Sequence, residues 1–149
     1  MRIIVDADAC PGRNLIEKAA IENGVEVIMY CDINHELKSD YSEVRVVDSG
    51  FQSVDMKIIN EAKENDIIVT QDYGVAAMVL GRKAFAINPN GYIYDDDNID
   101  RLLFERHLSA KARRGGKKTS NPKKRTDEDN LRLYNNILKL INKAKEKSN

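Results

Sequence analysis

The fold is decided first by residues 2–23, which read RIIVDADACPGRNLIEKAAIEN. The apolar run at 2–6 ends on Asp6, and a short run of this kind is typical of a buried strand. The Cys-Pro-Gly turn that follows predicts a helix over 13–23, which Gly24 ends. A buried strand followed closely by a helix is the first unit of a mostly parallel α/β sheet.

The rest of the chain repeats this alternation. Short apolar runs predict strands at 25–31, 44–48, 66–70 and 83–88, with YIYD at 92–95 as a candidate for one more. Helical spacing predicts helices at 53–63, 74–80 and 96–114. If the chain winds outward and then returns beside its first strand, the strand order is 3-2-1-4-5. We therefore predict an α/β fold: a three-layer sandwich with a mostly parallel five-stranded sheet, plus a C-terminal helix.

The end of the chain has a different character. Thr126 and Asp129 approximate a capping box at the start of a helix over 127–147. An apolar stripe must cover something, so we expect this helix to dock on the core or on a partner subunit; the stripe consists of Leu131, Tyr134, Ile137, Leu138 and Ile141. These boundaries predict an α/β domain at 1–112, a basic linker at 113–126 and the C-terminal helix. A homodimer is compatible with the same stripe.

The composition of the chain suits one globular domain, since 42% of its 149 residues are hydrophobic and 32% are charged. Cys10 and Cys31 are too few for a disulfide scaffold or a structural zinc site, which indicates a reducing compartment. No apolar run approaches the length of a signal sequence or a membrane span. We therefore expect a cytoplasmic protein that does not associate with membranes.

The formal net charge of zero hides a strong asymmetry. Residues 1–110 carry 20 acidic and 11 basic side chains, whereas residues 111–126 carry eight basic and no acidic ones. Such a basic run suits the phosphate backbone of nucleic acid, because each neutralised phosphate releases counterions. A solvated linker, or a strap folded on the acidic surface, explains the composition equally well. The residues predicted to contact nucleic acid are Arg113, Arg114, Lys117, Lys118, Lys123, Lys124 and Arg125.

Four aspartates lie where the predicted strands and helices meet. Asp6 and Asp72 follow the first and fourth strands, whose carboxyl ends flank the switch point of a 3-2-1-4-5 sheet. Asp55, near the start of a helix, can reach this crevice from the side, and Asp8 can coordinate or hydrogen-bond behind Asp6. Crowded carboxylates repel one another, and oxygen ligands suit Mg²⁺ or Mn²⁺. The pattern predicts a metal site that activates water for phosphodiester hydrolysis.

Other residues are second-tier candidates with a competing structural interpretation. A strand-end aspartate is often a helix cap or turn residue, and an acidic run more often begins a helix than binds metal. Hydroxyl and amide side chains in loops can bind phosphate or cap a helix. Cys10 precedes a helix, where a thiolate is favoured, but we interpret it as a small buried residue because no histidine is near in sequence. The second-tier candidates are Asp95, Asp96, Asp97, Asn14, Ser49 and Ser53.

Five stretches together span nearly the whole chain: VDADACPGRNLIEKAA at 5–20, VVDSGFQSVDMKIINEA at 46–62, DIIVTQDYGVAAMVL at 66–80, NPNGYIYDDDNID at 88–100 and TDEDNLRLYNNILKLI at 126–141. They resemble the YaiI/YqxD family of small bacterial proteins of unknown function. That family is considered related to PIN-like domains, which are metal-dependent ribonucleases with a 3-2-1-4-5 parallel sheet.

The resemblance implies that Asp6, Asp55 and Asp72 match the acidic metal-binding positions of a PIN-like site. Asp8 belongs to the DADACP signature of the family rather than to the general pattern. PIN nucleases usually add a glutamate from a helix, and no residue here, Glu36 and Glu43 included, is matched to it.

Three hypotheses about function follow. The leading one is a nuclease dependent on Mg²⁺ or Mn²⁺ that acts on RNA, with Asp6, Asp55 and Asp72 catalytic and Asp8 in support. The second is a non-catalytic PIN-like scaffold that binds RNA or a protein through the basic segment. The third is a phosphatase of the haloacid dehalogenase type, in which Asp6 is the nucleophile and Asp8 the general acid.

Overall fold

The computed structural model describes residues 1–35, 37–48, 50, 52–116 and 124–148. The strands are β1 (Arg2–Asp6), β2 (Glu26–Asp32), β3 (Glu43–Val47), β4 (Ile67–Val69), β5 (Phe85–Ile87) and β6 (Ile93–Tyr94). The helices are α1 (Arg13–Asn23), α2 (Val54–Glu61), α3 (Tyr73–Gly81), α4 (Asp96–Arg114) and α5 (Asp127–Ser148), with short 3₁₀ turns η1 (Ala7–Ala9) and η2 (Ile33–His35). Helix α4 thus continues past the predicted domain boundary at residue 112.

The strands form one sheet in the order β3-β2-β1-β4-β5-β6. This confirms the predicted order 3-2-1-4-5 and extends the sheet by a sixth strand. Strands β1 to β5 pair in parallel, whereas β6 runs antiparallel to β5. The reversal occurs because the backbone of Gly91, at a φ of 90°, turns the chain back so that Asn88 N donates to Tyr92 O at 2.9 Å.

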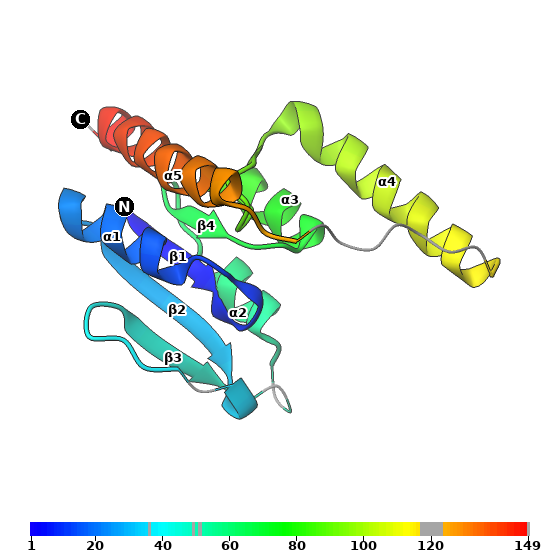
Figure 1. Cartoon of the computed structure of the whole chain (residues 1–149), viewed down its shortest axis with the longest axis horizontal. Coiled ribbons are helices and arrows are strands. Elements are labelled where there is room, and N and C mark those ends of the chain that lie inside the picture. The colour runs from blue at the N-terminus through cyan, green and yellow to red at the C-terminus, as the bar shows by residue number, and fades with distance from the viewer. Residues whose placement is uncertain (36, 49, 51, 117–123, 149) are drawn as a thin grey trace.

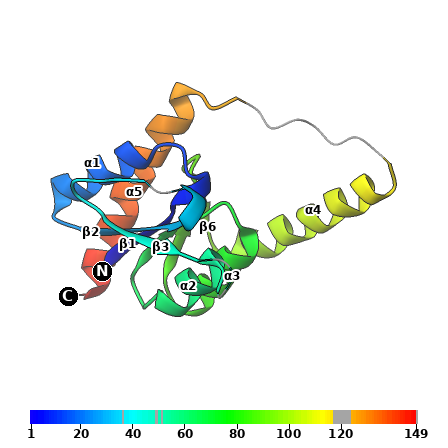
Figure 2. The ribbon, with the colours of Figure 1, turned by 90° about the horizontal axis from the view of Figure 1, so that it is seen from below.

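Helices cover both faces of the sheet, and alternate strand residues enter two separate cores. Ile3 and Val5 of β1 pack on the face of α1 and α5, whereas Ile4 packs on the face of α2 and α3. Figure 2 shows the two pairs of helices on opposite sides of the strands. Because both faces are covered, the central residues of each inner strand are buried and apolar, which is why these strands read as continuous apolar runs.

Helix α5 packs its apolar face against α1 and the sheet, as Figure 1 shows. The predicted stripe was wrong at Leu131, which is 62% exposed. Tyr134 and Leu138 are partly buried and pack against the core, as predicted. Both the predicted and the observed faces have helical spacing, so periodicity did not distinguish them. The side chains buried in the structure are Leu133, Ile137, Leu140, Ile141 and Ala144.

Two contacts fix the start of α5 on the body. Gly91 lies against the backbone of this helix, where a Cβ atom would come within 2.4 Å of Leu133 N. Just before the helix, Arg125 Nη1 donates to Pro89 O and to Asn90 Oδ1, both at 2.8 Å, and Nε donates to Asn130 Oδ1 at 2.7 Å. The end of the predicted basic linker is therefore latched to the β5–β6 turn.

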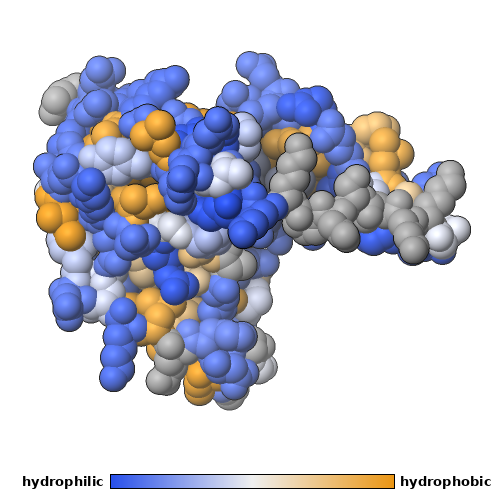
Figure 3. Space-filling model, in the orientation of Figure 1, coloured by the Kyte–Doolittle hydropathy of each residue, from blue (hydrophilic) through white to orange (hydrophobic). Residues whose placement is uncertain are grey.

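Helix α4 leaves the body as a projecting arm, which Figures 1 and 2 both show. Ile99, near its start, is buried in the core beneath α3. Phe104 and Leu108, further along, are 61% and 48% exposed, and Figure 3 shows hydrophobic surface on this arm. Among the described residues, the first part of α4 packs against the core, whereas these two side chains further along remain exposed.

Candidate functional site

Three of the predicted aspartates meet at the carboxyl ends of β1 and β4. The two strands pair in parallel, with Val5 beside Val69, so the segments that follow them leave the sheet at the same edge. Asp6 is the last residue of β1, Asp72 caps α3, and Asp55 lies in the first turn of α2. They share an open cavity of about 490 Å³, which we call the acid pocket; its lining is Asp6, Asp55, Gln71, Asp72, Tyr73 and Arg106.

The carboxylates in the acid pocket disfavour one another's ionisation. Burial, and then the charges of Asp55, Asp8 and Asp72, raise the pKa of Asp6 to about 6. Burial also raises the pKa of Asp55, and its hydrogen bond and charge contact with Asp72 add to this, while Arg106 opposes the shift. The pocket therefore holds more negative charge than its surroundings compensate.

Asp72 has a structural role besides its place in the pocket. Its Oδ1 atom accepts hydrogen bonds from Gly74 N at 2.8 Å and Val75 N at 3.1 Å, which caps α3. Its own backbone N–H donates to Thr70 Oγ1 at 3.0 Å. Arg106 Nη1 of α4 lies 3.8 Å from the same Oδ1 atom. These contacts orient the Asp72 carboxyl group before any ligand is present.

The chemistry of the acid pocket suits a hard divalent cation, because three carboxylates and the Gln71 amide offer oxygen ligands. Within the described residues, however, no three His, Cys, Asp or Glu side chains lie close enough together to hold a metal ion. Of the glutamates that the structure describes, none lines the pocket; Glu43 pairs with Arg45 Nη2 at 2.8 Å, and Glu36 lies outside the described residues. The carboxylates would therefore have to draw together around a cation.

Asp8 lies beside the acid pocket rather than in its lining. Both of its carboxylate oxygens accept from Asp32 N, at 3.1 and 2.9 Å, which ties η1 to the end of β2. Its charge is still close enough to raise the pKa of Asp6. The structure therefore places Asp8 near Asp6, with its carboxylate bound to the backbone at the end of β2.

The described second-tier candidates lie outside the acid pocket. Asp95 and Asn98 form a capping box at the start of α4, with Asn98 N donating to Asp95 Oδ1 at 2.7 Å. Asp96 and Asp97 are exposed in the first turn of α4, between these two residues, and Ser53 caps α2 by accepting from Met56 N at 3.2 Å. Asn14 is exposed on α1, beside a different cavity, and Ser49 lies outside the described residues.

The predicted nucleic-acid residues divide into three groups. Arg113 and Arg114 are exposed in the last turn of α4, and Lys124 is exposed near the start of α5. Arg125 is partly buried, and its guanidinium is engaged by the latch described above. Lys117, Lys118 and Lys123 lie outside the described residues.

Three residues of the acid pocket were missing from the predicted site: Gln71, Tyr73 and Arg106. Gln71 and Tyr73 flank Asp72 and so could have been included by adjacency. Arg106 had a subtler signal, because it continues the helical spacing of the apolar side chains Ile99 and Leu103. An arginine on the same helix face as buried residues is expected to pair with a carboxylate. In the structure that carboxylate belongs to Asp72.

Cys10 is not a reactive thiol. It is buried, and burial raises its pKa to about 12, although Arg13 and Arg125 act in the opposite direction. The thiolate is therefore scarce at neutral pH. This agrees with the interpretation of Cys10 as a small core residue.

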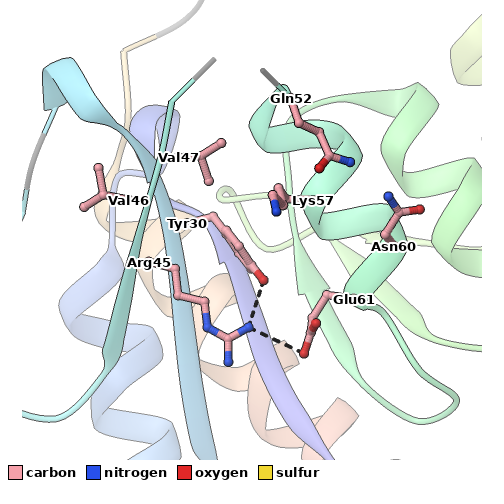
Figure 4. A pocket seen from close by; sticks show the side chains of 8 residues that line it. All are labelled: Tyr30, Arg45, Val46, Val47, Gln52, Lys57, Asn60 and Glu61. Carbon is pink, nitrogen blue, oxygen red and sulfur yellow. Dashed lines mark hydrogen bonds and ion pairs between the residues drawn. The ribbon is translucent and has the colours of Figure 1, made fainter. Parts of the chain in front are cut away.

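A further cavity, of about 420 Å³, lies between β3 and α2 (Figure 4). Its central side chain is Arg45, whose Nη1 atom donates to Tyr30 Oη at 2.9 Å and lies 3.5 Å from Glu61 Oε1. Figure 4 shows Lys57 and Asn60 on the α2 wall. Because its arginine is already paired with a carboxylate, this cavity is a weaker candidate for anion binding than its composition suggests.

The fold and the acid pocket define an α/β protein with a carboxylate cluster at its topological switch point. The chain belongs to the YaiI/YqxD family, as the resemblance implied: the family model described as "Uncharacterized BCR, YaiI/YqxD family" matches residues 4–143. A UPF0178 protein of Clostridium novyi is 97% identical over 149 residues, which is 100% of both chains. A UPF0178 protein of Clostridium tetani is 69% identical over 146 residues, covering 98% of this chain and 100% of the relative.

A more distant relative, a UPF0178 protein of Lachnoclostridium phytofermentans, is 48% identical over 144 residues, covering 95% of this chain and 97% of its own. No solved structure matches the chain. In the described part of the chain, none of the helices combines the length and apolarity of a membrane span.

Proposed function

We propose that this protein is a nuclease dependent on Mg²⁺ or Mn²⁺ that acts on RNA. The observation that supports this is the convergence of Asp6, Asp55 and Asp72 in one open pocket, where their charges raise the pKa of Asp6. Such repulsion lowers stability unless a cation offsets it, so clustered carboxylates at a ligand crevice favour a metal-binding role. The strand order is also that of the PIN-like ribonucleases that the family resembles.

In this proposal Asp6, Asp55 and Asp72 hold the cation. When bound, a divalent ion supplies activation of water and stabilisation of charge on the phosphodiester oxygens. The protein positions the ligands: Asp72 is oriented by the α3 N-terminus, and Asp6 by the end of β1. Asp8 keeps η1 against β2 and so holds the segment that follows Asp6.

In this proposal the basic residues of α4 bind the phosphate backbone of the substrate. Arg106, 57% exposed and beside Asp72, is placed to contact a phosphate at the acid pocket. Arg113 and Arg114 lie further along the same helix, in its exposed last turn. Since α4 projects from the body, a strand of RNA following it would lead from the arm toward the carboxylates.

A calorimetric Mn²⁺ titration tests the metal site. The wild type should bind Mn²⁺ saturably, and Asp6→Asn and Asp72→Asn should each lose this binding. Asp72→Asn is expected to fold, because asparagine caps helices about as well as aspartate. Asp100→Asn, an exposed acid on α4, is the matched control and should bind normally. No binding by the wild type at millimolar Mn²⁺ would exclude the metal site.

Hydrolysis is tested on the same set of proteins with end-labelled single-stranded RNA. Cleavage should require Mn²⁺ or Mg²⁺, stop in Asp72→Asn and persist in Asp100→Asn. Equal cleavage by wild type and Asp72→Asn would exclude a catalytic role for Asp72. Melting curves for each variant separate loss of chemistry from loss of folding.

A non-catalytic scaffold that binds RNA or protein is the second candidate. It is favoured by the distances between the carboxylates: they line one pocket, but within the described residues they do not lie close enough together to hold a metal ion. In that case Arg113→Gln with Arg114→Gln should weaken RNA binding equally with and without Mn²⁺, and flatten its salt dependence by about 2 in slope. The phosphatase alternative gains no support, because both oxygens of Asp8, its general acid, are engaged by Asp32 N.

A further inference from the structure

A second cavity, of about 370 Å³, lies next to the acid pocket and has a different chemistry. Its wall contains three tyrosines and three asparagines, together with Ile93 and Leu102, and its one charged lining residue in the described chain is Arg101. We call it the tyrosine pocket. Tyr73 lines both cavities, so the two share a wall directly after Asp72.

The aromatic rings of the tyrosine pocket are held in place by internal contacts. Tyr73 and Tyr94 meet edge to face, with ring centroids 5.8 Å apart and planes at 71°. Tyr94 Oη donates to Thr70 O at 3.2 Å, which anchors the pair to the end of β4. The wall shared with the acid pocket is therefore a fixed aromatic surface.

Tyr92 supplies a more accessible ring. The guanidinium of Arg132 lies 4.2 Å from the centroid of this ring, which holds it by a cation–π contact. Residue Tyr92 is nevertheless 54% exposed. A ring held in one orientation and open to solvent is suited to stacking against a flat ligand.

The asparagines of the pocket are oriented by hydrogen bonds to the β5–β6 turn. Asn88 Oδ1 accepts from Asn90 N and Tyr92 N, both at 3.0 Å, and Asn90 Oδ1 accepts from Arg125 Nη1. Asn98 Nδ2 already donates to Ile93 O at 3.0 Å, and Asn88 bonds the side chain of Tyr94. The Asn90 amide, whose oxygen is occupied by Arg125, presents its N–H donors beside the rings. Oriented amide groups beside aromatic rings match the needs of a nucleobase, which combines a flat face with hydrogen-bonding edges.

We propose that the tyrosine pocket binds a single unstacked nucleobase of the RNA whose phosphate lies at the acid pocket. This inference rests on the proposed function and names its substrate class as single-stranded RNA. The shared wall at Tyr73 places a base site and a phosphate site side by side, as adjoining parts of one nucleotide require. A base inside a duplex is stacked and paired, so it cannot enter such a pocket without being pulled out.

The test is a ¹⁵N NMR titration of the full chain in EDTA with adenosine or cytidine 5′-monophosphate, and with ribose 5-phosphate as the probe without a base. The nucleotides should shift the backbone amide resonances of Asn90, Tyr92 and Arg101, whereas ribose 5-phosphate should not. Equal shifts with ribose 5-phosphate, or no shift with any nucleotide, would overturn the base pocket. Shifts caused by an aromatic tripeptide but not by nucleotides would point instead to a peptide ligand and would also overturn it.

Variants then locate the binding. Tyr92→Ala should weaken nucleotide binding about 10-fold, as expected for the loss of one stacking partner. Phe104→Ala is the matched control, since it removes another exposed aromatic ring that lies outside the pocket, and it should bind normally. An equal loss in both variants, or in neither, would contradict the assignment.

The outcome for the base pocket can be distinguished from the outcome for the nuclease. If nucleotides bind but Mn²⁺ binding and RNA cleavage are absent, the proposed chemistry fails and the base site stands. The opposite result is Mn²⁺ binding with RNA cleavage but no nucleotide shifts, and equal cleavage of duplex and single-stranded RNA. In that case the base site fails and the nuclease assignment stands.

Discussion

Arg106 Nη1 lies 3.8 Å from Oδ1 of Asp72, and this oxygen also caps α3. The contact brings the projecting helix α4 to the carboxyl edge of the sheet, where Asp6 and Asp55 also lie. Arg106 is thus the positive charge of the acid pocket within the described residues, and it counters the pKa shift of Asp55. This guanidinium partly compensates the negative charge of the carboxylates. Its positive charge would therefore compete with any cation that they bind.

Replacing Arg106 therefore separates the two effects. In Arg106→Gln, Mn²⁺ affinity should rise about 3-fold because a like charge leaves the pocket, while RNA cleavage falls about 10-fold for lack of a phosphate contact. The free energy of unfolding should change by less than about 1 kcal/mol, since the pair is exposed. Calorimetry, cleavage assays and denaturation measure the three quantities. Arg82→Gln, an exposed arginine outside the pocket, is the control, and weaker Mn²⁺ binding in Arg106→Gln would contradict the model of competition.

Asp6 makes stability depend on pH. Its folded-state pKa of about 6 is above the ordinary 3.8, so between these values the folded protein holds a proton that the unfolded chain releases. The free energy of unfolding should fall as pH rises from about 4 to about 6 and lose no more from this group above that. Asp6→Asn should remove this loss and be more stable than wild type at pH 7.5 by on the order of 1–2 kcal/mol, after allowing for solvent screening.

Urea denaturation at pH 4 and pH 7.5 measures this difference. The advantage of Asp6→Asn should vanish at pH 4, where the wild-type carboxyl group is protonated. Asp100→Asn, an exposed acid on α4, should show no comparable change between the two pH values. An advantage for Asp6→Asn that is equal at both pH values would mean that packing, not charge, is responsible.

Asp8→Asn tests whether Asp8 is a metal ligand or a supporting residue. An asparagine side chain keeps one oxygen to accept from Asp32 N, so the turn should remain in place. We expect Mn²⁺ affinity to change by less than about 3-fold, and the free energy of unfolding by less than about 1.5 kcal/mol. Abolished Mn²⁺ binding in a folded Asp8→Asn protein would make Asp8 a direct ligand.

Arg125 should matter for folding. In Arg125→Met the atoms Pro89 O, Asn90 Oδ1 and Asn130 Oδ1 all lose a charged donor, and the protein should be less stable by about 2–3 kcal/mol. Lys124→Met, at the exposed neighbouring position, should change stability by less than about 0.5 kcal/mol. Thermal melting of both variants gives the comparison, and equal melting temperatures would show that the latch contributes nothing.

Gly91→Ala should disturb the packing of α5 against the β5–β6 turn. The added methyl group would come within 2.4 Å of Leu133 N and 2.5 Å of Arg132 C, and the φ of 90° is strained for alanine. Because both obstacles are backbone, a loss of about 3 kcal/mol or more is expected. Gly81→Ala, in α3, meets no atom within 4 Å and should be neutral or slightly stabilising. Similar melting temperatures for the two variants would disprove the close approach.

The fold was predictable to a large extent. The buried cores of parallel strands such as β1 and β4 are apolar, with glycine and polar residues between the strands, so their positions followed from local pattern. Their order followed from the assumed winding of the chain, which the structure confirms. Strand β6 was harder, because a two-residue strand has no periodicity of its own and forms only by pairing with β5. The buried face of α5 was also misjudged at Leu131, since that choice depends on where α1 lies.

The candidate site was predictable where it follows strand ends, and not where it depends on a helix arriving from elsewhere. Asp6, Asp55 and Asp72 could be brought to one edge from the strand order alone. Arg106 had only its helical spacing as a signal. Its contact with Asp72 and the tyrosine pocket could not be placed, because both depend on the paths of α4 and the β5–β6 turn relative to the sheet. Asp8 and Arg125 were predicted as site residues from their type, but their hydrogen-bond partners were decided by packing.

The sequence by itself determined the alternation of strands and helices, the parallel sheet and the edge at which its acids gather. These follow from local hydrophobic patterning and the handedness of crossovers, which act along short stretches of chain. Only the tertiary structure decided which groups from distant segments meet. It placed Arg106 against Asp72, the Asp8 carboxylate on the backbone N–H of Asp32, and Tyr73 between two cavities. Electrostatic energy depends on distances across the fold, and residue spacing along the chain does not specify those distances.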